Sequence, residues 1–414
     1  MTACVKSKLV LKCTPYESCV SAFFHEREVI LIKKVIPYIK DFFKRADIFL
    51  FSVCFLCACF SVYAVYVATS GMAAGGVIIS PTKCVIIQIL SIGIGVGAFV
   101  VFTVIDADIL GEQWRWLCVI NVALMVALVI FGSEGESGSR SWIRFAGISV
   151  QPSEIVKILY IVVAAKQMTY LKEHRDINSF LSVAQIAAHF VIVFGMIVVV
   201  GDDLGSGTII LALFLLMFFA AGIKLYWFAI GGAAVAAVIP LLWTYFLKDY
   251  QKQRLIAPYD KSIDPDGWGI TWQTTQSRYS LMAGRMTGAE ASHRATVFTG
   301  KHTDFVFASI GEKLGMIGCI FVIILLTIII VRCVYIGLHA GRMYDMLICI
   351  GVAGALAFQT FINIGMCIGV TPVIGIPLPF FSYGGSSMVT LFAAVGLVSG
   401  VHYKPKPEHF SMIY

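Results

Sequence analysis

Charged residues are scarce in this sequence. Asp, Glu, Lys and Arg make up 13% of its 414 residues, whereas soluble domains carry about 25%. Apolar residues make up 59%, and the mean hydropathy is +0.87. This composition excludes the two or three soluble domains that the length alone would suggest. The net charge of +7 therefore does not indicate nucleic-acid binding, and the positions of the basic residues indicate instead how the chain lies across a membrane.

The sequence also lacks a cysteine framework for disulfide bonds. Nine of its twelve cysteines lie in or beside apolar segments, where cysteine behaves as a small hydrophobic residue. Cys54-x-x-Cys57 has the spacing of a redox or metal site, but no His or second pair accompanies it in the span, so packing is the preferred interpretation. Residues 1–25 contain no cleavable signal peptide, because their apolar runs are short and interrupted by Lys and Glu.

Ten apolar segments are long enough to cross about 30 Å of hydrocarbon. They are 48–69, 84–105, 116–132, 154–171, 180–200, 205–222, 225–246, 305–335, 344–369 and 383–401. The segment 305–335 exceeds one span, and we expect it to tilt or to continue as a cytoplasmic helix. The sequence therefore predicts an all-α, polytopic membrane domain at 47–403. It is preceded by an extension, 1–46, and followed by a tail, 404–414.

The distribution of basic residues predicts the sides of the membrane. Nine of the 31 Lys and Arg residues precede the first span, which indicates a cytoplasmic N-terminus. Counting spans from there places the loops 70–83, 133–153, 201–204, 247–304 and 370–382 outside, and the C-terminus inside. Loop 247–304 is basic, but long loops cross the membrane regardless of charge. The extension contains either a membrane-surface amphipathic helix around residues 29–36 or a plain linker.

Glu154 and Lys157 are charged residues near the predicted outer end of a span. Pro152 is expected at the start of this helix, where proline is tolerated. A charge at this depth is costly unless it is paired or hydrated, which makes the two residues candidates for a functional site. They are equally well explained as an ion pair one helical turn apart. The sequence leaves both interpretations open.

Three further polar features lie on the predicted outer side. Asp203 is best explained as the N-cap of the following helix, with a functional role as the alternative. Asn363 lies in the middle of a span and is a candidate for interhelical hydrogen bonding. The run Pro372–Pro379 must break any helix, and we expect it to line a cavity, because non-helical backbone at membrane depth needs protein or water around it.

Asp304 is the most specific single candidate for a catalytic residue. It ends the long outer loop in His302-Thr303-Asp304, immediately before Phe305 begins a span. A carboxylate at the rim of an apolar pocket can have a raised pKa and act as a general base. The alternative is that Asp304 only caps the next helix.

These segments together resemble the SEDS family (shape, elongation, division and sporulation) of bacterial peptidoglycan glycosyltransferases. The matching motifs are GSRSWI and QPSEIVK within 138–157, DLG at 203–205, HTDFVFASIGEKLG at 302–315, and NIGM with PLPFFSYGGSS within 363–387. The resemblance covers 47–403. The stretch TPVIGIPLPFFSYGG is more similar to the elongation branch, RodA, than to the division branch, FtsW.

The resemblance implies an enzyme of the bacterial cytoplasmic membrane that polymerises lipid II into glycan strands at its outer face, during cell elongation. It implies that Asp304 is the catalytic base. It also implies that a set of polar residues contacts the substrate: Arg140, Trp142, Glu154, Lys157, Asp203, Gln276, Ser277, His302, Thr303, Ser382, Tyr383, Gly384, Gly385 and Ser386. Arg140 is the candidate for the diphosphate, because a guanidinium suits phosphate oxygens. A divalent cation, Mg or Mn, and a class B penicillin-binding protein are the implied cofactor and partner.

One segment departs from the family pattern. Residues 278–301 differ from the family's glycine-rich stretch, and Phe298-Thr299-Gly300 stands where the family has Leu-Pro-Glu. Either this chain handles the acceptor sugar differently, or it is a divergent and slow polymerase. Two alternatives to polymerisation also stay open. The first is a lipid II flippase, although the polar features lie on one side and no inverted repeat is evident. The second is a non-catalytic scaffold for the penicillin-binding protein.

Overall fold

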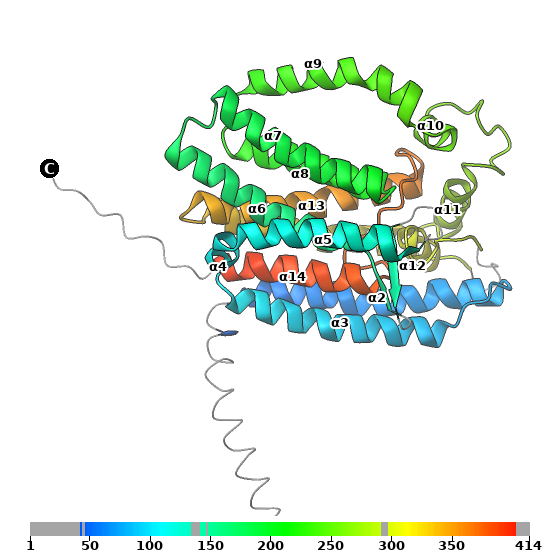
Figure 1. Ribbon diagram of the computed structural model, residues 1–414. Helices are drawn as coiled ribbons and strands as arrows, with labels where there is room; N and C mark the ends of the chain where they lie inside the picture. The colour runs from blue at the N-terminus through cyan, green and yellow to red at the C-terminus, as the bar shows by residue number, and fades with distance from the viewer. Residues whose placement is uncertain (1–41, 44–45, 134–140, 146–147, 291–296, 403–414) are drawn as a thin grey trace, which may run out of the picture. The chain divides into compact units, whose positions relative to one another are not determined.

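The computed structural model describes residues 42–43, 46–133, 141–145, 148–290 and 297–402 (Figure 1). The chain separates into two compact units, Met1–Lys44 and Arg45–Tyr414. Of the first unit only Phe42 and Phe43 are described, so the choice between helix and linker for residues 29–36 lies outside the described residues. The second unit contains every helix and strand that is labelled in Figure 1.

Helices occupy all ten segments that the hydropathy predicts as spans. They are α2 (Ile48–Ala74), α3 (Pro81–Val104), α5 (Trp114–Phe131), α6 (Pro152–His174), α7 (Phe180–Gly195) with π-helix η1 (Met196–Val200), α8 (Leu204–Ala220), α9 (Leu225–Leu241) with π-helix η2 (Leu242–Phe246), α12 (Val306–Leu338), α13 (Met343–Ile368) and α14 (Gly385–His402). In the described parts of the chain, eight of these are long and apolar enough to cross a membrane. Helix α8 is apolar but only 17 residues long, and α6 carries Glu154, Lys157 and Lys166. The chain is a multi-pass helical membrane protein, as predicted.

Local sequence rules explain where several helices begin. The first N–H groups of a helix lack partners within the helix, so a capping side chain stabilises its start. Asp47 accepts a hydrogen bond from the N–H of Leu50 at the start of α2. Asp203 accepts one from the N–H of Ser206, at 2.8 Å, so the predicted N-cap of α8 is confirmed. Pro152 occupies the first turn of α6, also as predicted.

Glycine residues let α14 lie directly against the backbone of α3. A Cβ atom at Gly396 would be 2.7 Å from the carbonyl oxygen of Phe99, and one at Gly400 would be 3.0 Å from that of Thr103. Figure 1 shows α14 lying along α2 and α3, and α3 and α14 pack closely. Small residues serve this purpose in membranes, where helices associate through close packing.

The structure adds elements that the sequence did not predict. Helix α4 (Ala107–Glu112) lies in the loop 106–115, and α10 (Asp249–Ile256) and α11 (Trp272–Ala283) lie in the long loop 247–304. The loop 133–153 contributes to a small antiparallel sheet with strand order β1-β2-β3. Its strands are β1 (Gly132–Ser133), β2 (Trp142–Phe145) and β3 (Ile148–Val150). Apart from the 12-residue α11, these elements are too short for hydrophobic periodicity to reveal them.

The excess length of the segment 305–335 comes from a break in α12 rather than from a cytoplasmic extension alone. At Gly315 the backbone leaves the helical conformation (φ 67°, ψ −163°), so residues 306–314 form a short helix ahead of the longer one. The N–H groups of Met316 and Ile317 then donate to the carbonyl oxygens of Arg285 and Met286, at 2.9 and 3.2 Å. The turn that follows α11 thus supplies the acceptors at the break.

We expect Gly315→Ala to destabilise the protein. A Cβ atom at this position would be 2.4 Å from the carbonyl group of Met286, and a left-handed backbone costs a non-glycine residue roughly 1–3 kcal/mol. The measurement is the melting temperature of the purified protein in detergent. Gly231→Ala in α9 is the control, because its Cβ atom would meet nothing within 4 Å. Equal melting temperatures for the two variants would contradict the proposed role of Gly315.

Candidate functional site

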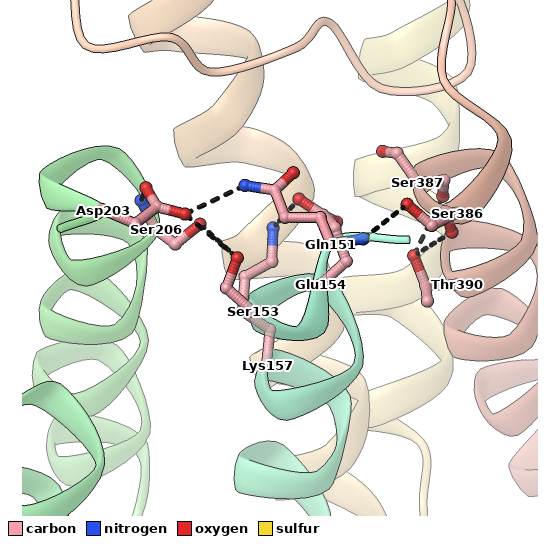
Figure 2. Close-up of polar contacts among 9 residues, drawn as sticks. All are labelled: Gln151, Ser153, Glu154, Lys157, Asp203, Ser206, Ser386, Ser387 and Thr390. Atoms are coloured by element: carbon pink, nitrogen blue, oxygen red, sulfur yellow. Dashed lines mark hydrogen bonds and ion pairs between the residues drawn. The ribbon is translucent and has the colours of Figure 1, made fainter. Parts of the chain in front are cut away.

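Polar side chains from the starts of α6 and α8 form one hydrogen-bonded cluster (Figure 2). The Asp203 Oδ2 atom accepts from Gln151 Nε2 at 2.9 Å and from Ser153 Oγ at 3.0 Å, while its Oδ1 atom caps α8. The hydroxyl group of Ser206 donates to that of Ser153 at 3.0 Å. The backbone N–H of Gln151 donates to Ser386 Oγ, at 3.3 Å. The cluster therefore joins α6 and α8 to the start of α14.

Glu154 and Lys157 form the ion pair that was one of their two interpretations. Lys157 Nζ lies 2.7 Å from Glu154 Oε1, and both side chains are buried. Figure 2 shows both residues on α6, with their charged ends beside the Asp203 cluster. Pairing offsets the cost of burying each charge, so the geometry satisfies the structural interpretation. A substrate-contacting role for the two residues stays a prediction.

The segment His302–Asp304 is held through its backbone. Tyr383 N–H donates to the carbonyl oxygen of His302 at 3.0 Å, and the Ser382 hydroxyl donates to that of Thr303 at 2.6 Å. Asn363 Nδ2 donates to the carbonyl oxygen of Asp304 at 2.7 Å. Three successive carbonyl groups are thus bound by residues from α13 and from the chain just before α14. Asn363 was predicted to bond between helices. Its amide instead donates to backbone carbonyl groups of two non-helical stretches, so it forms hydrogen bonds as expected but the interhelical part of the prediction is wrong.

The Asp304 side chain is half-buried and lies beside the non-helical run. A Cβ atom at Gly375 would be 3.6 Å from Asp304 Oδ2, and Gly375 has a left-handed backbone (φ +69°). Phe305, not Asp304, is the N-cap residue of α12, and no side-chain cap bond is present there. Asp304 therefore directly precedes the cap position, and its role as a base or as a cap stays a prediction. A Cβ atom at Gly375 would only make ordinary contact with the carboxylate, so the left-handed backbone is what favours glycine there.

The run before α14 is shaped by its own hydrogen bonds as well as by its prolines. Residues 372–378 are non-helical, as predicted. Ser382 Oγ accepts from the N–H of Leu378 at 2.8 Å, and Asn363 Nδ2 donates to the carbonyl oxygen of Ile376 at 2.7 Å. Phe380 adopts a left-handed backbone (φ 62°). Side chains that are buried in α13 and in the run itself therefore satisfy this irregular backbone, as its place in a membrane requires.

The other predicted site residues lie at different places around this segment. His302 packs its ring against that of Tyr383, with centroids 5.4 Å apart. A Cβ atom at Gly385 would be 3.1 Å from Ser91 Oγ, and Gly384 accepts a helix-starting bond from Met388. Ser277 is buried on α11 and donates to the carbonyl oxygen of Cys367, and Gln276 beside it is half-buried. Trp142 is half-buried on β2, and Arg140 lies outside the described residues.

Several polar residues of this region were not predicted as site residues. Gln88 of α3 is fully buried, and its Nε2 donates to Ser61 Oγ at 2.9 Å and to the carbonyl oxygen of Ser382 at 3.4 Å. A single amide in a strongly apolar span was a signal that could have identified it. Lys301 and Glu312 form a buried ion pair beside His302. Burial lowers the pKa of Lys301, and the Glu312 carboxylate opposes that shift.

A small pocket opens next to the Asp203 cluster. It is lined by residues of α10, by the start of α8, and by Val373 and Ile374 of the non-helical run. The run therefore lines a cavity, as predicted. Among the described residues, His, Cys, Asp and Glu form no group of three or more that could hold a metal ion. The expected divalent cation stays a prediction without assigned ligands.

Comparisons with known proteins identify the family of this chain. The family described as "Cell cycle protein", of FtsW, RodA and SpoVE, matches residues 47–406. Peptidoglycan glycosyltransferase MrdB of Escherichia coli (strain K12) is 32% identical over 299 residues, which cover 70% of this chain and 78% of MrdB. Stage V sporulation protein E of Bacillus subtilis (strain 168) is 31% identical over 318 residues, 74% of this chain and 84% of that protein.

Two solved structures share the fold. A chain of a peptidoglycan synthase complex, studied for the structural coordination of polymerization and crosslinking, matches with a TM-score of 0.70 and 26% identity, covering 86% of this chain and 97% of that chain. Rod shape determining protein RodA of Thermus thermophilus matches with a TM-score of 0.63 and 22% identity, covering 86% and 96%. The fold is thus that of a RodA-like multi-pass membrane protein. The chain belongs to the SEDS family.

We expect Asn363→Asp to destabilise the protein by roughly 1–3 kcal/mol for each carbonyl group left without a donor. The substitution keeps the shape of the side chain, but a carboxylate cannot donate to Asp304 and Ile376 as the amide does. Thermal unfolding in detergent measures the loss. The control is Thr360→Val on the same helix, because the Thr360 hydroxyl bonds only the carbonyl oxygen of Leu356 within its own helix. A loss no larger than that of the control would show that Asn363 does not hold the segment.

Proposed function

We propose that this chain polymerises lipid II into glycan strands at the outer face of the cytoplasmic membrane. Lipid II carries its sugars on a lipid through a diphosphate. The observation that carries the proposal is the position of Asp304. Its backbone is fixed by Asn363, and its half-buried carboxylate faces a glycine. The family membership and the similarity to Peptidoglycan glycosyltransferase MrdB support it.

Asp304 acts as the general base in this proposal. A carboxylate oxygen of Asp304 takes the proton from the 4-hydroxyl group of an N-acetylglucosamine. The oxygen of that hydroxyl group then attacks C1 of the sugar of a second lipid-linked chain. The new bond forms between that oxygen and C1 as the bond from C1 to the diphosphate oxygen breaks. The lipid diphosphate then leaves. A fixed backbone at His302–Asp304 helps because general-base catalysis requires the carboxylate within hydrogen-bond reach of the hydroxyl group.

The neighbouring polar residues have distinct roles in this proposal. Asp203 has bonds from Gln151, Ser153 and Ser206 before any substrate arrives, so its carboxylate is already oriented. Lys157 supplies a positive charge near the reacting groups, and Glu154 keeps it in place. Arg140 is the candidate for contact with the diphosphate. A divalent cation, if bound, would neutralise charge on that group.

The biological role that we propose is cell elongation, with a class B penicillin-binding protein as partner. The stretch 371–385 is more similar to the RodA branch, but relatives from the sporulation branch are about equally similar. The related chain from a peptidoglycan synthase complex supports an assembly that couples polymerization to crosslinking. The alternatives are a transport function and a scaffold function, and the assay below distinguishes both of them from polymerisation.

We expect Asp304→Asn and Asp304→Ala to lower the initial rate of lipid II polymerisation at least about a hundredfold, because a positioned general base contributes typically 10²–10⁴-fold. The assay uses the full chain purified with its penicillin-binding partner and fluorescent lipid II, with the products resolved on a gel. Asp266→Asn is the control, because Asp266 is an exposed acid of the same long loop.

Each alternative function has its own outcome in this assay. Polymerisation by Asp304→Ala at the rate of the unmodified chain would show that Asp304 is not the base. Absence of polymer from the unmodified chain, together with movement of lipid II across vesicle membranes, would support transport. Absence of polymer with stimulation of the partner's crosslinking would support the scaffold function.

The proposal also requires Asp304 and the polar clusters to face the outside. We expect alkaline phosphatase inserted after Asp266 to be active in cells, and a green fluorescent protein fused after the C-terminus to fluoresce. The control insertion follows Gly341, in the exposed turn between α12 and α13, where alkaline phosphatase should be inactive. The reverse pattern would place the clusters on the cytoplasmic face and exclude lipid II polymerisation there.

A further inference from the structure

The pocket beside Asp203 has a size that restricts its ligand. Its volume is about 60 Å³, and it lies between α10, the start of α8 and the non-helical run. A cavity of roughly 150 Å³ in another protein holds one benzene molecule. This pocket therefore encloses two or three heavy atoms, such as the outer end of a short substituent on a sugar, but not a whole sugar ring.

The pocket lining offers both donors and acceptors of hydrogen bonds. Arg254 supplies a guanidinium group that contacts the ring of Tyr250, with its Cζ atom 5.7 Å from the centroid, and forms no ion pair with any residue that the structure describes. The two carboxylates of the lining are already engaged. Asp202 accepts from Lys248 at 3.2 Å and from Gln251 at 3.3 Å, and Asp203 caps α8. A carboxylate has about four acceptor sites, so both retain capacity for a ligand N–H.

The rest of the lining is apolar. Leu204, Leu255, Val373 and Ile374 belong to this part of the lining. A ligand group that suits this combination has an acceptor for Arg254, a donor for a carboxylate and a small apolar end. An acetamido group has these three features. A phosphate group suits it less well, because its oxygens mostly accept and two carboxylates would face it.

The pocket is joined to the segment that contains Asp304 by short, tightly packed stretches of backbone. A Cβ atom at Gly205 would be 2.4 Å from the carbonyl oxygen of Ile374, and Gly375, the next residue, faces the Asp304 carboxylate. Asp202, which also lines the pocket, adopts a left-handed backbone (φ 46°). Strain of this kind in a non-glycine residue persists where the surroundings impose it, often at ligand sites.

We propose that this pocket binds the acetamido group of one N-acetylhexosamine of the substrate, and that it makes the enzyme specific for N-acetylated sugars. This inference rests on the proposed function. Arg254 donates to the acetamido oxygen, Asp202 or Asp203 accepts from its N–H, and the methyl group lies against Leu255 and Val373. The methyl end determines how long an N-acyl chain the enzyme accepts.

The test compares lipid II with two analogues, in which the acetyl group of one sugar or the other is lengthened to butanoyl. We expect the unmodified chain to polymerise native lipid II at least about tenfold faster than one of them, because extra methylene groups in a filled apolar pocket cost about 10–200-fold. Leu255→Ala enlarges the pocket, so it should bring the two rates close to equality. Ile256→Ala is the control, since Ile256 is the next residue of α10 and does not line the pocket.

The polar half of the pocket has a separate test. We expect Arg254→Gln to slow polymerisation of native lipid II about tenfold or more, and to leave unchanged the rate for an analogue with a hydroxyl group in place of the acetamido group. Lys252→Gln, which removes another cation of α10 that does not line the pocket, should change neither rate.

The outcomes separate this inference from the proposed function. A preference that follows the acyl group of either sugar supports the pocket and identifies the sugar. Equal rates for native lipid II and both butanoyl analogues, or an unchanged preference in Leu255→Ala, would overturn the assignment while polymerisation itself stands. Absence of polymer from native lipid II would instead overturn the proposed function.

Discussion

Hydrogen bonds to the carbonyl groups of His302, Thr303 and Asp304 connect the end of the long loop to α13 and to the stretch just before α14. Backbone acceptors that are removed from water need donors, and here Tyr383, Ser382 and Asn363 supply them. Two of these donors lie in the stretch just before α14, so that stretch has to run irregularly rather than as a helix. The prolines and glycines of 372–385 make this path possible. Motifs that are distant in the sequence therefore have one shared structural cause.

The carboxylates of this region show that structural and chemical roles do not exclude one another. One oxygen of Asp203 caps α8 while the other is oriented by Gln151 and Ser153. The predicted helix cap therefore also helps to orient the Asp203 carboxylate. Glu154 and Lys157 form a simple one-turn ion pair, yet they lie next to this cluster and are buried. A preoriented cluster of this kind is what electrostatic catalysis needs.

The sequence predicted the features that depend on composition or on near neighbours. Lipid requires long apolar helices, so hydropathy located the spans, and the cap at Asp203 follows from residues three positions apart. It did not predict the bond from Gln151 to Asp203, because the partners are 52 residues apart and their pairing depends on how α6 and α8 pack. The break at Gly315 was missed for the same reason. A glycine inside an apolar run has no local signature, and its cause is the contact with Met286.

The glycine contact with α3 holds α14 along its length, so a change of tilt at this contact would displace the start of α14. Ser386 stands in the first turn of this helix, and Gly396 is ten residues further along, about 15 Å away at the rise of an α-helix. The backbone of α3 at Phe99 fixes Gly396 in position, so a small tilt there is magnified at the helix start. That start carries the chain that holds His302–Asp304. The packing of α14 on α3 therefore also helps to position the stretch that binds the carbonyl groups of His302 and Thr303.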